Sequence, residues 1–373
     1  MTSIAIIGCG FVADLYMRSL EQFADLSIDL VYDRDAERLK AFCSYWKLKP
    51  AATLDALLGG LEPKSIILNL TNPSAHFEIN QACLKAGHHV YSEKPLAVNM
   101  DHANALYDLA KERGLMLASA PCSVLSQTAQ TLAKAVRDDV AGTPRLIYAE
   151  LDDGFIPQAP YKNWVSESGA PWPFEDEFRT GCTLEHAGYY LSWLIGIFGP
   201  VDRVVAASAV VVPDKGVDTD TPDFSVAVLF FKSGVVARLT CSIVAPHDHQ
   251  IRVIGDKGVL AVKKAWDNAA PVRFHRRFKI RRRLVDHPFG KKIRLKGLMP
   301  EKVKRRGAAS MNFALGVAEM VAALREVRDC RMSADFALHI NEVTLAIQNA
   351  HATDGVQKMQ TRCEALKPMT WAT

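Results

Sequence analysis

The sequence has 373 residues, of which 49% are hydrophobic and 23% charged, and its formal net charge is +4. This length exceeds what one ordinary hydrophobic core needs, so we expect two domains. The sequence contains no run of about 18 apolar residues and no basic leader before the first strand pattern, so we expect a cytoplasmic protein without a spanning helix. Eight scattered cysteines without a CxxC pair predict reduced, mostly buried thiols.

The first residues show the order strand, glycine turn, helix. An apolar, β-branched run covers Ser3–Ile7, the turn reads GCGFVA, and residues 14–20 have helical spacing. This GxGxxA pattern is typical of dinucleotide binding, because the first glycine permits a tight turn and the second lets the backbone approach a pyrophosphate at the helix N-terminus. The alanine lets helix and strand pack closely. We predict cofactor contacts from Gly8, Gly10, Phe11, Val12 and Ala13.

The second strand, Ile28–Tyr32, ends at an acidic residue, Asp33, at the distance expected for a ribose ligand. A carboxylate accepts hydrogen bonds from the 2′-hydroxyl of NAD and repels a 2′-phosphate, which favours NAD. Arg34 beside it offers a partner for that phosphate, so NADP stays open. The alternative is an N-cap or turn aspartate before the next helix.

Two more strand–helix units follow and end at a candidate acid or base. Strands at residues 65–70 and 88–91 alternate with helices, and a last short strand covers residues 115–119, which predicts a parallel, doubly wound sheet. Lys94 follows the second of these strands in Glu93-Lys94-Pro95, where such a sheet leaves its ligand crevice. A titratable lysine there is a candidate proton donor or acceptor, and the alternative is a solvated loop lysine.

These motifs together resemble the Gfo/Idh/MocA family of sugar and cyclitol oxidoreductases. The resemblance rests on GCGFVA, the acid after strand two, TNPSAH after a later strand and SEKP about 20 residues on, and features near residues 181–199, 254–258 and 331–335 extend it. It implies a nicotinamide and a substrate carbinol near Lys94, sometimes with a cis bond before Pro95. It also implies cofactor contacts from the segments after the strands, at Thr71, Asn72, Pro73, His76, Glu93 and Lys94.

The second half predicts an α+β domain. Strand patterns at residues 145–151, 204–212, 224–231, 235–244, 250–254 and 259–262 are joined by short turns, with one helix at about 184–197. We therefore assign residues 1–120 to a Rossmann domain and 121–373 to a substrate-binding domain with an open, predominantly antiparallel mixed sheet. The resemblance implies that this sheet serves as a dimer or tetramer face. A late helix at about 333–352 is expected to pack back on the Rossmann domain.

The helix at 184–197 carries the predicted second half of the active site. The family motif there is DxGxH, and alignment on Gly188 places His186 at the Asp position and Tyr190 at the His position. The two residues are four apart, so they share one helix face, and both transfer protons. The implied mechanism is proton abstraction from a hydroxyl by Lys94 or Tyr190 while a hydride passes to NAD⁺, with burial disfavouring the charged form of Lys94. The alternative is a satisfied histidine and a core tyrosine.

Two further segments carry weaker signals. The long loop around residues 161–179 is expected to roof the substrate, with Lys162, Trp164 and Arg179 in contact with it, or else to be a surface excursion. His247-Asp248-His249 is interpreted as a turn rather than a metal site, because no set of cysteines or carboxylates lies near it in the sequence.

One segment supplies the excess positive charge. Residues 273–306 hold 15 Lys or Arg against two acids. We interpret this segment as a solvated insertion, with weak contact to an anionic membrane surface or capture of a phosphorylated or nucleotide-linked sugar as sharper alternatives. Nucleic-acid binding is not expected, because no aromatic platform accompanies the charge.

The sequence as a whole predicts a cytoplasmic, homo-oligomeric NAD(P)-dependent dehydrogenase or reductase. Its substrate would be the CH–OH group of a sugar, cyclitol or nucleotide-sugar derivative, with no metal. The alternative is a family member without catalysis that binds dinucleotide or sugar as a sensor or scaffold in polysaccharide assembly.

Overall fold

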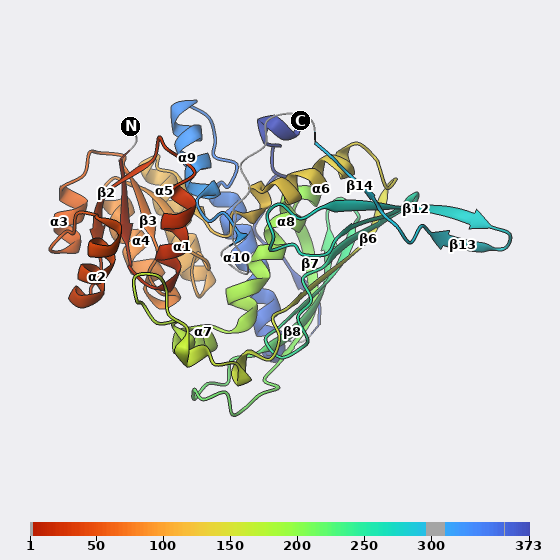
Figure 1. The fold of residues 1–373 in the computed structure, drawn as a ribbon, viewed down its shortest axis with the longest axis horizontal. Helices are drawn as coiled ribbons and strands as arrows, with labels where there is room; N and C mark the ends of the chain where they lie inside the picture. Colours follow the sequence, from red (N-terminus) through yellow and green to blue (C-terminus); the bar gives the residue numbers. More distant parts are fainter. Residues whose placement is uncertain (1–2, 296–309, 354) are drawn as a thin grey trace.

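A computed structural model describes residues 3–295, 310–353 and 355–373. Figure 1 shows two α/β units side by side, with helices from the end of the chain between them. Among the described residues, no helix is long and apolar enough to cross a membrane.

The first unit is a five-stranded parallel sheet with helices on both faces, which confirms the predicted doubly wound fold. All residues of β3 (Ile66–Asn69) and β4 (His89–Ser92) are buried, as expected where helices cover both faces of a sheet. In sheet order the strands are β2 (Ser27–Tyr32), β1 (Ser3–Ile7), β3 (Ile66–Asn69), β4 (His89–Ser92) and β5 (Leu117–Ser119). The helices are α1 (Phe11–Leu20), α2 (Ala36–Trp46), α3 (Leu54–Gly59), α4 (His76–Lys85) and α5 (Met100–Arg113).

The second unit is a ten-stranded mixed sheet, mostly antiparallel, as predicted. Within the described residues only β6 and β9 pair in parallel. Burial alternates along β8, so one face packs on helices and the other is more exposed. In sheet order the strands are β13 (Arg283–Asp286), β12 (Val272–Ile280), β11 (Gly258–Val262), β10 (Ile251–Gly255), β6 (Pro144–Asp152), β9 (Val236–Ser242), β8 (Phe224–Phe231), β7 (Val201–Ala209) and β15 (Gln357–Lys358), with β14 (Lys291–Lys292) beside β12.

The helices of the second half are α6 (Gln127–Arg137), α7 (Phe174–Thr180), α8 (Gly188–Phe198), α9 (Leu315–Arg325) and α10 (Ala334–Gln348). Helices α6 and α10 pack on the large sheet, whereas α9 packs on β4 and β5 of the first unit. The late helix α10 contacts both units: Asn341 Oδ1 accepts the N–H of Ala97 at 3.2 Å, and the Tyr107 hydroxyl donates to Asp335 at 2.8 Å. The predicted helix at 184–197 is divided, because Thr183–Ala187 has π-helical hydrogen bonding before α8 begins.

The basic segment extends the large sheet as far as it is described. Strands β12 and β13 form a hairpin that projects from the body of the molecule (Figure 1), so this part is a regular extension rather than an irregular insertion. Its tip exposes Ile280 and Leu284 together with the basic side chains. The rest of the segment, residues 296–306, lies outside the described residues, and contact with an anionic surface stays a prediction.

Candidate active site

The two glycines of the first turn have different surroundings. Gly8 has a positive φ of 97°, and a Cβ there would lie 2.7 Å from backbone atoms of Leu70 and Thr71. A Cβ at Gly10, by contrast, would meet no atom within 4 Å. The first glycine therefore permits the close approach of β1 to the end of β3, and the second leaves space at the N-terminus of α1, as the pyrophosphate of a dinucleotide requires.

Asp33 lies at the end of β2, directly beside this turn. Its Oδ2 accepts the N–H of Cys9 at 2.7 Å, and its Oδ1 accepts the N–H of Asp35 at 2.8 Å. These bonds fix a buried carboxylate whose remaining lone pairs suit ribose hydroxyls. The guanidinium of Arg38 is 3.9 Å away, and Arg34 is exposed beside it. Cations next to the carboxylate leave the choice between NAD and NADP open.

The turn after β3 is tied to the Glu93-Lys94-Pro95 segment by a buried histidine. The His76 ring lies between two backbone carbonyls, with Nδ1 2.7 Å from the oxygen of Pro95 and Nε2 2.9 Å from that of Thr71. Thr71 also bonds Asn69 through its N–H and its hydroxyl. His76, predicted as a cofactor contact, thus has both ring nitrogens engaged, and its geometry is that of a residue that positions these two segments.

Lys94 is held at the end of β4 by neighbours on both sides. Glu93 Oε1 accepts the hydroxyl proton of Tyr16 at 2.6 Å, and its Oε2 accepts the N–H of Lys94 at 3.0 Å. The Lys94–Pro95 peptide bond is cis, the form that the family resemblance implied. The ammonium group of Lys94 donates to the buried carboxylate of Glu185, which lies in the second unit.

The charge state of Lys94 differs from the expectation. Burial alone lowers its pKa, but the neighbouring acidic groups, Glu185 above all, outweigh burial and raise the pKa well above the usual value of lysine. Burial, and then the neighbouring Glu185, raise the pKa of Glu177 to about 8. Without cofactor, the site therefore holds a charged lysine, and Glu177 keeps its proton near neutral pH.

The residues that approach Lys94 from the second unit are one position earlier than predicted. Glu185 pairs with the ammonium group, and the nearby charge of Lys94 acts to lower the pKa of Tyr189, which burial nevertheless raises. Tyr190 is instead 1% exposed in the core, and its hydroxyl has no hydrogen-bond partner among the described residues. Glu185 and Tyr189 keep the spacing of four that was predicted for His186 and Tyr190, so the whole pair is shifted by one residue, in a segment with π-helical hydrogen bonding.

His186 lies beside a different group of residues. Its Nδ1 is 3.2 Å from Asp153 Oδ2, and its ring packs edge-on against Trp266. Burial lowers the pKa of His186, Asp153 raises it, and the charge of Lys94 lowers it further, so His186 is near the lysine without pairing with it. Glu185, and not His186, forms the ion pair with Lys94, and a part of His186 in proton transfer stays a prediction.

The long loop does not bring its predicted residues to Lys94. Lys162 lies over the ring of Phe174, and Arg179 pairs with Glu175 one helical turn away. Trp164 packs against Trp172 in the same loop. These side chains stabilise the loop itself, and a substrate contact by Lys162, Trp164 or Arg179 stays a prediction.

The same loop is anchored on the first unit. Arg18 Nε donates to Glu167 at 2.8 Å, the Ser168 N–H donates to Asp14 at 2.9 Å, and Asn72 donates to Asp176 in α7. The loop therefore contacts the first turn of α1 through Asp14 and the turn after β3 through Asn72. It therefore borders the predicted cofactor groove.

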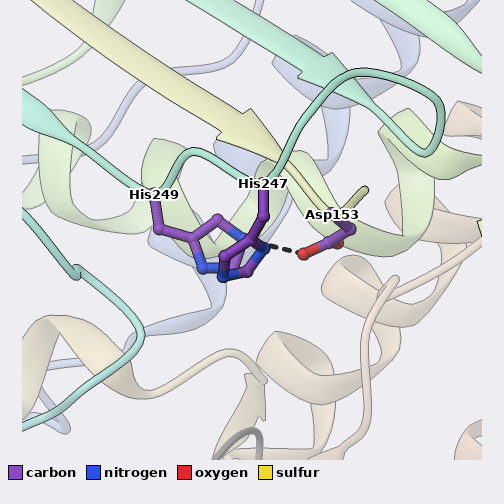
Figure 2. A group of neighbouring side chains, drawn as sticks. All are labelled: Asp153, His247 and His249. Carbon is purple, nitrogen blue, oxygen red and sulfur yellow. Dashed lines mark hydrogen bonds and ion pairs between the residues drawn. The ribbon is translucent and has the colours of Figure 1, made fainter. Parts of the chain in front are cut away.

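His247 and His249 meet a carboxylate that is distant in the sequence. Figure 2 shows both rings turned toward Asp153, which follows β6, and His249 Nε2 is 2.7 Å from Asp153 Oδ1. One ligand atom of each residue lies within 4.8 Å of the others, a separation that fits a metal ion. A metal site was not expected because no carboxylate set lies near these histidines in the sequence. The backbone bridge between Asp152 and Asp248 brings Asp153 to them.

Sequence reasoning thus missed Glu177, Glu185, Tyr189 and Asp153. Glu185 and Tyr189 stand in the motif segment, and a shift of the whole motif by one residue would have found them. Glu177 and Asp153 have no local signal, because their neighbours come from other segments.

Both units match one family. Residues 2–120 match the "Oxidoreductase family, NAD-binding Rossmann fold" and residues 129–261 the "GFO/IDH/MocA C-terminal domain". The chain is 28% identical over 238 residues to UDP-N-acetylglucosamine 3-dehydrogenase of Acidithiobacillus ferrooxidans, and the matched region covers 64% of this chain and 66% of that protein. It is 25% identical over 268 residues to myo-inositol 2-dehydrogenase of Thermotoga maritima, covering 68% and 73%.

A solved structure shows the same fold over nearly the whole chain. The WlbA dehydrogenase of Bordetella pertussis, solved with NADH and UDP-GlcNAcA, superposes with a TM-score of 0.74 at 18% identity, covering 96% of this chain and 97% of that one. The chain therefore belongs to the GFO/IDH/MocA oxidoreductase family, and residues 2–120 form its NAD-binding Rossmann domain.

Proposed function

We propose that this protein transfers a hydride between NAD or NADP and the carbinol or ketone of a sugar, cyclitol or nucleotide sugar. The observation that carries this proposal is the charged Lys94, held at the end of β4 between Glu93 of one unit and Glu185 of the other. Relatives named for UDP-N-acetylglucosamine and myo-inositol, and a structure with UDP-GlcNAcA, support this substrate class.

The residues around the first turn fit the cofactor. Gly10 leaves space at the N-terminus of α1, and Asp33 presents a fixed carboxylate to the ribose. When bound, the nicotinamide supplies the hydride donor or acceptor.

The acidic groups around Lys94 suit proton transfer. In ketone reduction the ammonium group donates a proton to the developing alkoxide oxygen, while Glu185 keeps the side chain in place. Glu177, whose pKa is raised to about 8 by burial and by Glu185, holds a proton that can replace the one lost. Oxidation needs Lys94 without its proton, so the ammonium group first passes its proton to the carboxylate form of Glu177, and the neutral amine then accepts the hydroxyl proton. Tyr189 replaces Tyr190 as the aromatic hydroxyl that borders this site.

The test is turnover with NAD and NADP against a panel of sugars, cyclitols and nucleotide sugars, followed by absorbance of the reduced nicotinamide. Lys94→Met should abolish turnover and keep cofactor binding, measured by calorimetry. The matched control, Lys111→Met, changes an exposed lysine of α5 and should keep both. Full activity of Lys94→Met would contradict the proposal.

One observation favours a second function, that of a binding protein without turnover. The residues that approach Lys94 from the second unit are Glu185 and Tyr189 instead of the Asp and His of the family motif, and Glu185 forms an ion pair with the ammonium group. Tight cofactor or sugar binding with no turnover across the panel, in wild type as well as in Lys94→Met, would favour a sensor or scaffold.

A further inference from the structure

We propose that Asp153, His247 and His249 bind a divalent transition-metal ion of the zinc class, with one coordination position open to solvent. The three side chains come from two segments of the second unit, the residue after β6 and the residues before β10. Figure 2 shows the three side chains gathered together, with the Asp153 carboxylate beside the two rings and bonded to His249. This site is distinct from the proton relay at Lys94 and does not depend on it.

The backbone fixes the three ligands before any ion binds. Asp152 and Asp248 exchange two backbone hydrogen bonds, at 3.0 and 2.9 Å, so the residues on either side of this bridge are held in register. The N–H of Ala265 donates to the carbonyl of His249 at 2.9 Å and holds the far end of the loop. Ligands held in this way lose little conformational freedom on binding an ion.

The side chains are also held individually. The His249 ring is buried and packs on Trp266, with ring centroids 4.3 Å apart. The rings of His247 and His249 are 4.0 Å apart, and their nitrogens and Asp153 Oδ1 lie close enough for one ion to join them after a small adjustment. His247 is exposed, which leaves the ion an entry path and an open position.

Two buried polar atoms at this site, Asp153 Oδ2 and His186 Nδ1, lie 3.2 Å apart. The contact lacks the angles of a hydrogen bond, and neither atom has a hydrogen-bond partner elsewhere in the described residues. An imidazole that faces the outer oxygen of a ligating carboxylate orients it, and such outer partners are typical of metal sites. His186 is therefore assigned as a positioning residue for Asp153.

The donor set selects the class of ion. Two imidazole nitrogens and one carboxylate oxygen suit Zn²⁺, Co²⁺ and related ions, whereas Mg²⁺ and Ca²⁺ prefer oxygen ligands alone. Three protein ligands with an open fourth position are typical of zinc ions that bind a water or a substrate oxygen. Because His186 adjoins Glu185, the open position lies in the same part of the molecule as Lys94.

The experiment uses the full chain, stripped of metal with a chelator and studied without cofactor. Zn²⁺ is titrated by calorimetry, and Co²⁺ is added to record its visible absorption. We expect one ion per chain and a Co²⁺ spectrum typical of four or five ligands. His247→Ala should remove both signals, and because His247 is exposed this variant should melt at the temperature of the metal-free wild type.

Two more variants complete the test. His186→Phe should weaken Zn²⁺ binding about 10- to 100-fold and keep the stoichiometry, as expected for the loss of an outer partner. His351→Ala changes an exposed histidine elsewhere and should bind like the wild type. Binding that is absent in the wild type, or unchanged in a folded His247→Ala, would overturn the proposal.

Discussion

Removing the charge of Lys94 should make stability strongly dependent on pH. In Lys94→Met, the carboxylate of Glu185 stays buried without its cation and must either remain charged or take up a proton. An unperturbed glutamate has a pKa of about 4.3, so protonating it costs about 5 kcal/mol at about pH 8 and about 1 kcal/mol at about pH 5. Each value is the upper limit of the loss in the free energy of unfolding at that pH, so the loss grows as the pH rises.

Urea unfolding at several pH values, followed by circular dichroism, measures this loss. Adding Glu185→Gln to the variant should recover most of the stability near pH 8 and little near pH 5, while turnover stays absent. Lys134→Met serves as the control, because its pair with Asp138 is partly exposed and should cost less than about 1 kcal/mol. A loss that is independent of pH, or that Glu185→Gln does not reverse, would refute the reasoning.

Three other outcomes are expected. Gly8→Ala should clearly lower the melting temperature, because the added Cβ would lie 2.7 Å from backbone atoms. Gly10→Ala should melt at the temperature of the wild type and bind NAD more weakly, because its Cβ would enter open space. Equal melting temperatures of the two variants would be inconsistent with the turn described. Because the pKa of Glu177 is raised to about 8, the folded state keeps a proton that the unfolded chain releases, so stability should fall as the pH rises from about 5 to about 8. Glu177→Gln should flatten this profile in urea titrations, and an unchanged profile would speak against it. The open face of the large sheet predicts a dimer or tetramer, which sedimentation velocity checks and which a monomer would contradict.

The first unit was predictable because its signals are local. A strand, a glycine turn and a helix follow one another within 20 residues, and the role of Gly8 is set by the end of the neighbouring strand. The alternation of strands and helices then determines a parallel sheet with its crevice at Lys94. In the second unit, period-two patterns gave the strands but not their partners, so the parallel pair β6 and β9 had no sequence signal.

The site of the second unit was harder to predict for the same reason. Whether Glu185 or His186 faces Lys94 depends on the hydrogen bonding of one helical turn, which apolar spacing does not reveal. Asp153 and His249 are 96 positions apart and meet only through the bridge between their neighbours. The charge of Lys94 likewise depends on carboxylates from separate segments, so its pKa followed from the fold and not from burial alone.

The loop that reaches from the second unit to α1 also has a kinetic consequence. Its anchors, Arg18 with Glu167 and Asp14 with Ser168, lie on α1, so a dinucleotide bound at the N-terminus of this helix would lie beside the loop, and opening of the loop would ease its release. The Arg18 pair is accessible to solvent, so added salt would screen it and shorten the residence time of the cofactor.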